Sequence, residues 1–161
     1  MKKLLVFAAL LLVGGCGIQP TPVIQVGTAP TIHDQSSPDL TLYFVTQGRV
    51  VSATRATGST LSPATALNML LKGPNQSESS QGLYTELPAA TGEAITVDTR
   101  TFPVDVRVPF SVKELSDVAI NQLACTSIAA LATSGQTRES GVGVFLTTTD
   151  AKLGPRNCQT S

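Results

Sequence analysis

The chain has 161 residues, of which 42% are hydrophobic and 14% are charged, and its eleven Lys and Arg residues balance eleven Asp and Glu residues. This length suits one modest domain with its own core, and the apolar fraction argues against general disorder. Because the basic residues are not clustered, the sequence does not predict nucleic acid as a partner.

Residues 1–15 have the layout of a secretory signal peptide. Two lysines precede an apolar run that is too short for an ordinary membrane span of about 20 residues. The run ends in VGGC, whose cysteine is Cys16, and this motif resembles the lipobox of bacterial lipoproteins. The resemblance implies cleavage before Cys16 and acylation that holds the protein on the extracytoplasmic face of the cell membrane. The alternative is an ordinary signal peptide with a cysteine nearby.

Residues 16–39 are predicted to form a flexible tether behind the lipidated cysteine. Prolines interrupt the segment repeatedly, and little periodicity persists. A flexible segment of this length has a typical end-to-end distance of roughly 26 Å, so the domain can lie near the bilayer without touching it. His33, the only histidine in the sequence, lies in this segment and is interpreted as a solvated linker residue.

Two strands joined by a tight turn are predicted to begin the folded domain, which we expect to span residues 40–149. Residues 40–46 alternate between two faces, and residues 49–57 are rich in β-branched side chains. The Gln47-Gly48 pair between them suits a hairpin turn.

A helix is then predicted between a start signal at Ser62 and a stop signal at Gly73. Ser62 can cap the free amides at its start, with a proline in the first turn. Gly73 and the proline after it end the helix, because glycine tolerates left-handed geometry and proline cannot continue a helix. The polar residues 75–80 that follow are predicted to be a variable loop.

The second half of the domain contains three further predicted strands. Residues 94–100 and 102–110 have strand character, and Pro103 predicts a place near the edge of the sheet for the second. Residues 141–149 form the last predicted strand, which leaves residues 150–161 as a tail outside the domain.

A long helix is predicted from residue 112 to about residue 132. Ser111 and Glu114 have the spacing of a capping box at its start. The resulting order is β-β-α-β-β-α-β. We therefore expect a small single-domain α+β fold, an α/β two-layer arrangement in which the two helices cover one mixed sheet.

Five short motifs follow one another through the predicted domain: LTLYFV, SATRAT, ALNMLLKGP, GLYTELP and QLACTSIAAL. Their order and spacing resemble the GerMN domain, a family named from proteins of sporulation and spore germination. The resemblance implies a small α/β domain related to the ring-building domains of envelope assemblies, found in bacterial surface and lipoprotein contexts without known catalysis. Acidic residues are common after the family's Gly-Pro pair, whereas here Glu78 stands alone among Asn, Gln and Ser.

The sequence offers little for catalysis or for metal binding. The domain has no histidine for a nucleophile–base pair, and Cys125 and Cys158 alone cannot supply the usual tetrahedral zinc ligands. Asp98 and Asp105, on neighbouring predicted strands, are interpreted as solvated carboxylates rather than as a catalytic pair. We therefore expect no enzymatic activity, no cofactor and no metal.

Two residues in the matched motifs are candidates for interaction with a partner. Arg55 either anchors an acidic group of the partner or pairs internally with Asp98 or Glu86, and the internal role is favoured. Tyr84 either offers an exposed aromatic contact or packs over its loop with a wet hydroxyl.

A disulfide between Cys125 and Cys158 is predicted from compartment and position. An exported chain can keep two cysteines oxidised, and a tail without periodicity frays unless it is tied down. The alternative is a buried thiol at Cys125 with Cys158 free or paired to another chain.

Three classes of function remain open. The first is an interaction or assembly module whose partners are the lipid bilayer, through Cys16, and another envelope protein. The second is a module that binds cell-wall glycan, such as peptidoglycan, or a small ligand, although the two Tyr, five Phe and no Trp are few for sugar platforms. The third, an envelope hydrolase, is disfavoured by the missing histidine.

Overall fold

The structure is a computed structural model that describes residues 39–90, 92–136 and 143–160. The predicted signal peptide, Cys16 and nearly all of the tether with His33 lie outside the described residues. The described part has mixed helix and strand content, with a four-stranded mixed sheet and a separate two-stranded hairpin. This confirms the predicted α+β fold class.

The domain opens with the predicted hairpin, formed by β1 (Asp39–Thr46) and β2 (Arg49–Ala56). Both turn residues have positive φ, 50° at Gln47 and 71° at Gly48, which matches the twist of a two-residue hairpin. Alternate residues of β1 face the core and are buried: Leu40, Leu42 and Phe44. Val45, on the opposite face of the strand, is buried as well.

The next element is α1 (Pro63–Leu71), which begins and ends where the sequence predicts. The Ser62 hydroxyl accepts a hydrogen bond from the Thr65 amide at 3.1 Å, and Gly73 follows the helix with φ +80°. The segment behind it is not a plain loop, because it contains a short helix, α2 (Gln76–Ser80). The prediction of a loop over residues 75–80 was therefore wrong.

Four short strands form the second sheet, in the spatial order β3-β4-β5-β6. The outer pairs are antiparallel and β4 runs parallel to β5. The strands are β3 (Thr96–Asp98), β4 (Val104–Arg107), β5 (Val144–Thr147) and β6 (Lys152–Arg156).

Two predictions about this sheet were wrong. The strand after Pro103 is not near an edge, because β4 lies between β3 and β5. Pro103 precedes the first residue of β4, so its missing N–H does not interrupt the ladder. In addition, the tail predicted over residues 150–161 contributes β6, which pairs with β5 and extends the sheet.

The long helix starts later than predicted. Ser111 caps only a 3-10 turn, η1 (Val112–Glu114), by accepting a hydrogen bond from the Lys113 amide at 3.1 Å. Leu115 is extended, and Ser116 then caps α3 (Asp117–Thr133) through the Ala119 amide at 3.0 Å. The capping box predicted from Ser111 and Glu114 is therefore replaced by two serine caps in succession.

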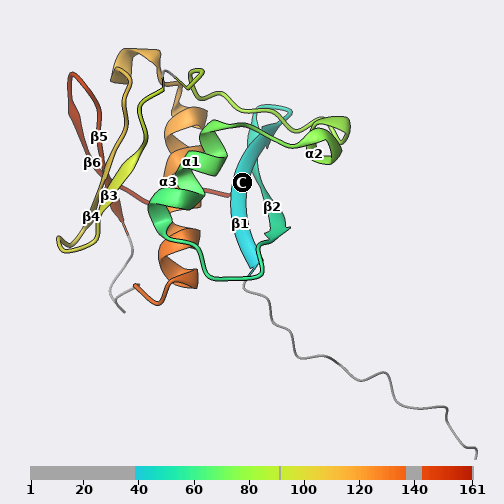
Figure 1. Ribbon diagram of the computed structural model, residues 1–161. Coiled ribbons are helices and arrows are strands. Elements are labelled where there is room, and N and C mark those ends of the chain that lie inside the picture. The colour runs from blue at the N-terminus through green and yellow to red at the C-terminus, as the bar shows by residue number, and fades with distance from the viewer. Residues whose placement is uncertain (1–38, 91, 137–142, 161) are drawn as a thin grey trace, which may run out of the picture. The chain divides into compact units, whose positions relative to one another are not determined.

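Figure 1 shows α1 and α3 between the hairpin and the four-stranded sheet, so that the helices pack on both sheets rather than on one. The strands form two sheets instead of the expected single sheet. The edge of β1 that faces away from β2 cannot pair with the other strands, because other groups occupy it. The Tyr43 amide donates to the Thr126 hydroxyl of α3 at 3.0 Å, and Val45 pairs with the backbone of Tyr84.

The aliphatic core joins the two sheets through these helices. Buried side chains from every layer form one cluster, including Leu42, Phe44, Leu67, Leu70, Val106, Leu123, Leu131 and Leu146. Each such side chain contributes about 1.5–3 kcal/mol before conformational entropy is subtracted. This core holds the hairpin and the loops around it in fixed positions.

Candidate interaction surface

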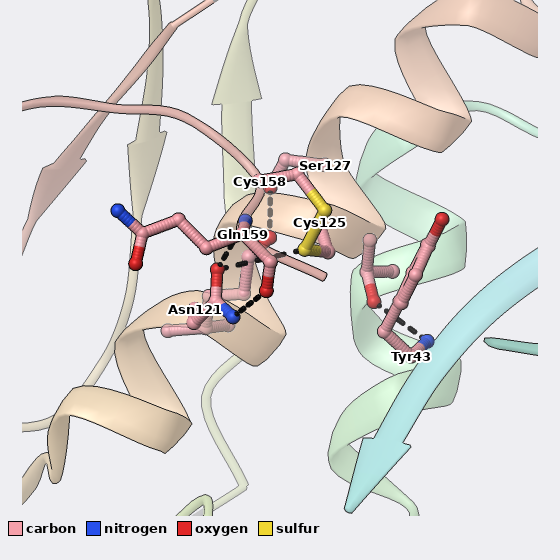
Figure 2. The surroundings of a disulfide bond; sticks show 8 residues. Tyr43, Asn121, Cys125, Ser127, Cys158 and Gln159 are labelled. Atoms are coloured by element: carbon pink, nitrogen blue, oxygen red, sulfur yellow. Dashed lines mark hydrogen bonds between the residues drawn. A yellow bond between two sulfur atoms is a disulfide. The ribbon is translucent and has the colours of Figure 1, made fainter. Parts of the chain in front are cut away.

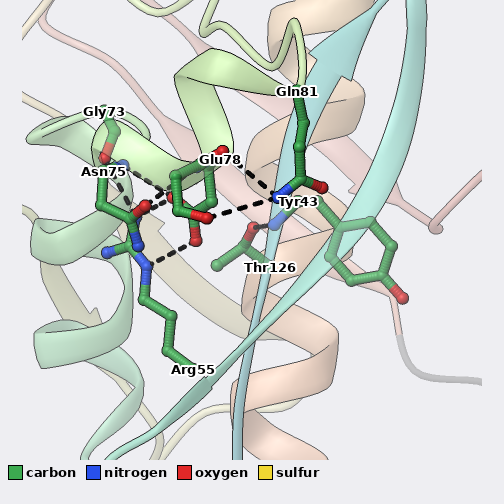
Figure 3. Close-up of polar contacts among 8 residues, drawn as sticks. Tyr43, Arg55, Gly73, Asn75, Glu78, Gln81 and Thr126 are labelled. Atoms are coloured by element: carbon green, nitrogen blue, oxygen red, sulfur yellow. Dashed lines mark hydrogen bonds and ion pairs between the residues drawn. The ribbon is translucent and has the colours of Figure 1, made fainter.

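Arg55 lies near the end of β2 and is turned into the protein. Its Nε donates to Oε1 of Glu78 at 2.8 Å, and its terminal amino group reaches Oε2 of the same carboxylate at 2.5 Å (Figure 3). The same group donates to the Gly73 carbonyl at 3.2 Å, and the guanidinium carbon lies 5.4 Å from the centre of the Phe44 ring. Arg55 thus joins β2 to the end of α1 and to α2.

Glu78 is buried, although it is the only acidic residue of its segment. Its Oε2 accepts a hydrogen bond from the Asn75 amide at 2.7 Å, while Asn75 accepts from the Glu78 amide at 2.9 Å. This capping box forms α2. The hydrogen bond from Arg55 lowers the pKa of Glu78 against the opposing effect of burial, so the carboxylate is ionised at neutral pH.

The structural role favoured for Arg55 is therefore present, but both predicted partners were wrong. Glu86 instead accepts a hydrogen bond from Ser116, at the start of α3. Asp98 pairs with Arg100, which is close in sequence, through contacts of 2.9 Å. The sequence does not indicate Glu78 as the partner, because residue spacing does not reveal that α2 folds back over the end of β2.

The predicted disulfide between Cys125 and Cys158 is present (Figure 2). Next to it, Asn121 holds the backbone of Gln159 at two points. Its Nδ2 donates to the Gln159 carbonyl at 2.5 Å, and its Oδ1 accepts from the Gln159 amide at 2.9 Å. The tail after β6 is thus fixed on α3 by a covalent bond and by hydrogen bonds that imitate strand pairing.

Tyr84 presents an exposed aromatic ring beside the hairpin. Its backbone exchanges hydrogen bonds of 2.8 and 2.9 Å with Val45, and 42% of the residue is exposed. Residues that face each other across antiparallel strands share a side of the sheet, as do residues two apart in one strand. Tyr43 and Tyr84, the two tyrosines of the chain, therefore lie on the same side of the hairpin. We call this surface the tyrosine face.

Asp98 and Asp105 face each other across β3 and β4, as their neighbouring positions predicted. Asp105 accepts hydrogen bonds from Lys152 and Thr147, both at 2.7 Å. Burial acts to raise the pKa of Asp105, but these two partners outweigh it and the pKa is lowered. Hydrogen bonds from Arg100 lower the pKa of Asp98 to about 2. Both groups are ionised at neutral pH, so neither has the raised pKa that suits a general acid.

A shallow hollow of about 560 Å³ lies over these two carboxylates. Its lining is mostly polar and includes Thr96, Thr99, Thr101, Arg100 and Arg107. Hydroxyl, carboxylate and guanidinium groups at one place can hydrogen-bond a polyhydroxylated or anionic ligand. The hollow therefore offers groups that suit a small polar ligand.

Sequence reasoning missed the polar residues of α3 that position the tyrosine face. The buried Gln122 accepts hydrogen bonds at its Oε1 from the Thr85 hydroxyl at 3.2 Å and from the Glu86 amide at 3.3 Å. One turn later, Thr126 binds the Tyr43 amide. Their signal in the sequence was the spacing of four residues between Gln122 and Thr126, which places two polar side chains on the same side of the predicted helix.

Comparisons of the chain with protein-family models, with curated proteins and with solved structures find no match. Within residues 39–90, 92–136 and 143–160, no helix has both the length and the hydropathy needed to cross a membrane. In the same part of the chain, no three His, Cys, Asp or Glu side chains gather into a group that could hold a metal ion.

Proposed function

We propose that this chain is a membrane-anchored bacterial lipoprotein whose GerMN-like domain is a non-catalytic interaction or assembly module at the cell envelope. Its anchor is the acylated Cys16, which follows a signal peptide of residues 1–15. The tether lets the domain reach another envelope protein from the membrane surface.

The observation that carries the proposal is the tyrosine face. Tyrosine is enriched at the energetic centres of protein interfaces, because its ring is largely apolar and its hydroxyl tolerates water. The ring of Tyr84 is held at the surface by a backbone bridge to Val45 rather than by burial in the core. Arg55, the other candidate, is committed to Glu78 and supports the fold.

The alternative function is binding of cell-wall glycan or of another small polar ligand. The hollow over Asp98 and Asp105 favours it, since its polar lining suits hydroxyl groups. A hydrolase at the same place is disfavoured, because both carboxylates are ionised and each is engaged by a cation.

Two parallel experiments separate these functions. Tagged protein is recovered from detergent-solubilised membranes, and purified protein is sedimented with isolated cell wall. We expect recovery of a defined envelope protein that Tyr84→Ala reduces and Arg107→Ala does not. Sedimentation with cell wall that is lost in Arg107→Ala and kept in Tyr84→Ala would contradict the proposal and support the glycan-binding alternative.

A further inference from the structure

Three of the four strand edges in the described domain are closed, short or irregular. The free edge of β1 is occupied by Tyr84 and by the hydroxyl of Thr126. The strand β3 has only three residues. The strand β6 contains Gly154 and Pro155, and its register with β5 is shifted. Such features hinder the addition of another strand.

The edge of β2 has none of these features. The peptide groups of Tyr43 and Val45 point away from β2. In an antiparallel pair, residues opposite such positions also point their peptide groups outward. The opposite residues, Ser52 and Val50, therefore point their peptide groups away from β1. Ser52 and Thr54 are exposed, and no hydrogen bond of their outward peptide groups is present within the described domain.

The middle of the β2 edge carries no charged side chain that would repel another strand. The strand reads RVVSATRA and contains no Lys, Asp, Glu or Pro. The guanidinium of Arg55 is neutralised by Glu78 inside the protein. Arg49 is exposed, but it lies at the other end of the strand, next to the turn.

We propose that β2 is the docking edge for a second copy of this chain, whose own β2 pairs with it antiparallel about a two-fold axis at Ala53. The inference rests on the proposed function, because it names one way in which an assembly module assembles. In this register Ser52 of one copy faces Thr54 of the other, so their outward peptide groups can exchange hydrogen bonds. Two hairpins then form one four-stranded sheet through a closed, symmetric interface.

The charges are compatible with this register. Arg55 of each copy faces the small, uncharged Val51 of the other. The two Arg49 residues lie at opposite ends of the new sheet, about eight positions apart along the strands, which is about 27 Å. Their repulsion is screened at that separation, because the Debye length is about 8 Å at physiological ionic strength.

The test is cysteine cross-linking of the full chain in the membranes of expressing cells. Two-fold pairing makes Ala53 face its own copy as a non-hydrogen-bonded pair, with Cα atoms about 4.5 Å apart. This distance suits a disulfide. Mild oxidation should therefore convert most of the Ala53→Cys chain into a covalent dimer, and it should leave the matched Arg49→Cys chain monomeric.

Two edge variants supply an independent readout by sedimentation of the detergent-solubilised chain. Ser52→Pro removes an outward N–H without removing a hydrogen bond of the β1–β2 ladder. Thr54→Lys places a charge on the same edge and tests the proposal if Ser52→Pro does not fold. The unmodified chain should sediment as a dimer, and either folded variant should sediment as a monomer.

The proposal is overturned if Ala53→Cys does not form a dimer, if Arg49→Cys does so equally, or if the folded edge variants stay dimeric. Cross-linking of the Ala53→Cys chain to a different protein would also overturn it, since that result makes the edge a site for another partner. A monomer that still binds an envelope protein through Tyr84 refutes this inference alone. A β2 dimer without any other envelope partner leaves the inference standing and refutes the proposed envelope partner.

Discussion

Replacement of Glu78 by Gln should destabilise the domain strongly, although α2 is short and lies at the surface. The side chains of Arg55 and Glu78 are only 17% and 9% exposed. Removing one partner of a buried ion pair costs about 3–5 kcal/mol, because the remaining charge is left without compensation. Since Arg55 is not fully buried and keeps the Gly73 carbonyl, we expect the lower end of that range, about 3 kcal/mol.

The assay is urea unfolding of the purified chain, with Asp98→Asn as the matched control. Asp98 also pairs with an arginine, but the Arg100 side chain is 88% exposed. The unfolding free energy that Asp98→Asn removes should therefore be far smaller than that removed by Glu78→Gln. A double-mutant cycle with Arg55→Met should give a coupling energy above about 1 kcal/mol. A loss below about 1 kcal/mol in Glu78→Gln, or no coupling energy between the two positions, would show that the Arg55–Glu78 pair does not stabilise the domain.

The difference in unfolding free energy between the unmodified chain and Glu78→Gln should depend on pH, because the pKa of Glu78 is lowered in the folded state. Because the folded state holds the carboxylate ionised more strongly than the unfolded state does, its contribution is complete above the ordinary value of 4.5. It is lost as the pH falls through the folded pKa. The difference between the unmodified chain and Glu78→Gln should therefore be constant above about pH 5 and should shrink below pH 4.5.

Three further predictions concern the anchor, the disulfide and the end of α1. Cys16→Ser should leave the protein unprocessed or shed from the membrane, and an unacylated intact mass of the native protein would contradict the lipoprotein assignment. Cys125→Ser with Cys158→Ser should lower the unfolding free energy by about 3 kcal/mol, since the disulfide closes a loop of 33 residues; two free thiols in the non-reduced, unfolded native chain would show that the bond is absent in solution. Gly73→Val should cost about 1 kcal/mol or more in urea unfolding because φ is +80°, whereas Gly154→Ala, whose added Cβ meets nothing within 4 Å, should be nearly neutral.

Elements with local signals could be predicted from the sequence. The turn at Gln47-Gly48, the cap at Ser62 and the stop at Gly73 each depend on the conformational preference of one or two residues. The disulfide could be predicted because residues 1–15 resemble a signal peptide, an exported chain can keep cysteines oxidised, and Cys158 lies in the segment after the predicted last strand. The helix α2 was not predicted, because QSESS has no apolar periodicity. Asn75 and Glu78 have the spacing of a capping box, which was a signal for this helix in the sequence.

Features that depend on tertiary packing could not be predicted in the same way. The strand β6 contains Gly154 and Pro155, which are breakers in isolation, and it forms because β5 offers a free edge to pair with. The partner of Arg55 depends on how α2 folds back over β2. The separation into two sheets depends on Thr126 and Tyr84, which occupy the edge of β1 from distant parts of the sequence.

Site-specific photo-cross-linking in intact membranes can show which surface of the domain contacts another envelope protein. A photoreactive phenylalanine derivative replaces Tyr84 on the tyrosine face in one chain and Arg107 on the four-stranded sheet in another. We expect a covalent adduct with another envelope protein from position 84 and none from position 107. Adducts from both positions alike, or from position 107 alone, would contradict the assignment of the tyrosine face as the interaction surface.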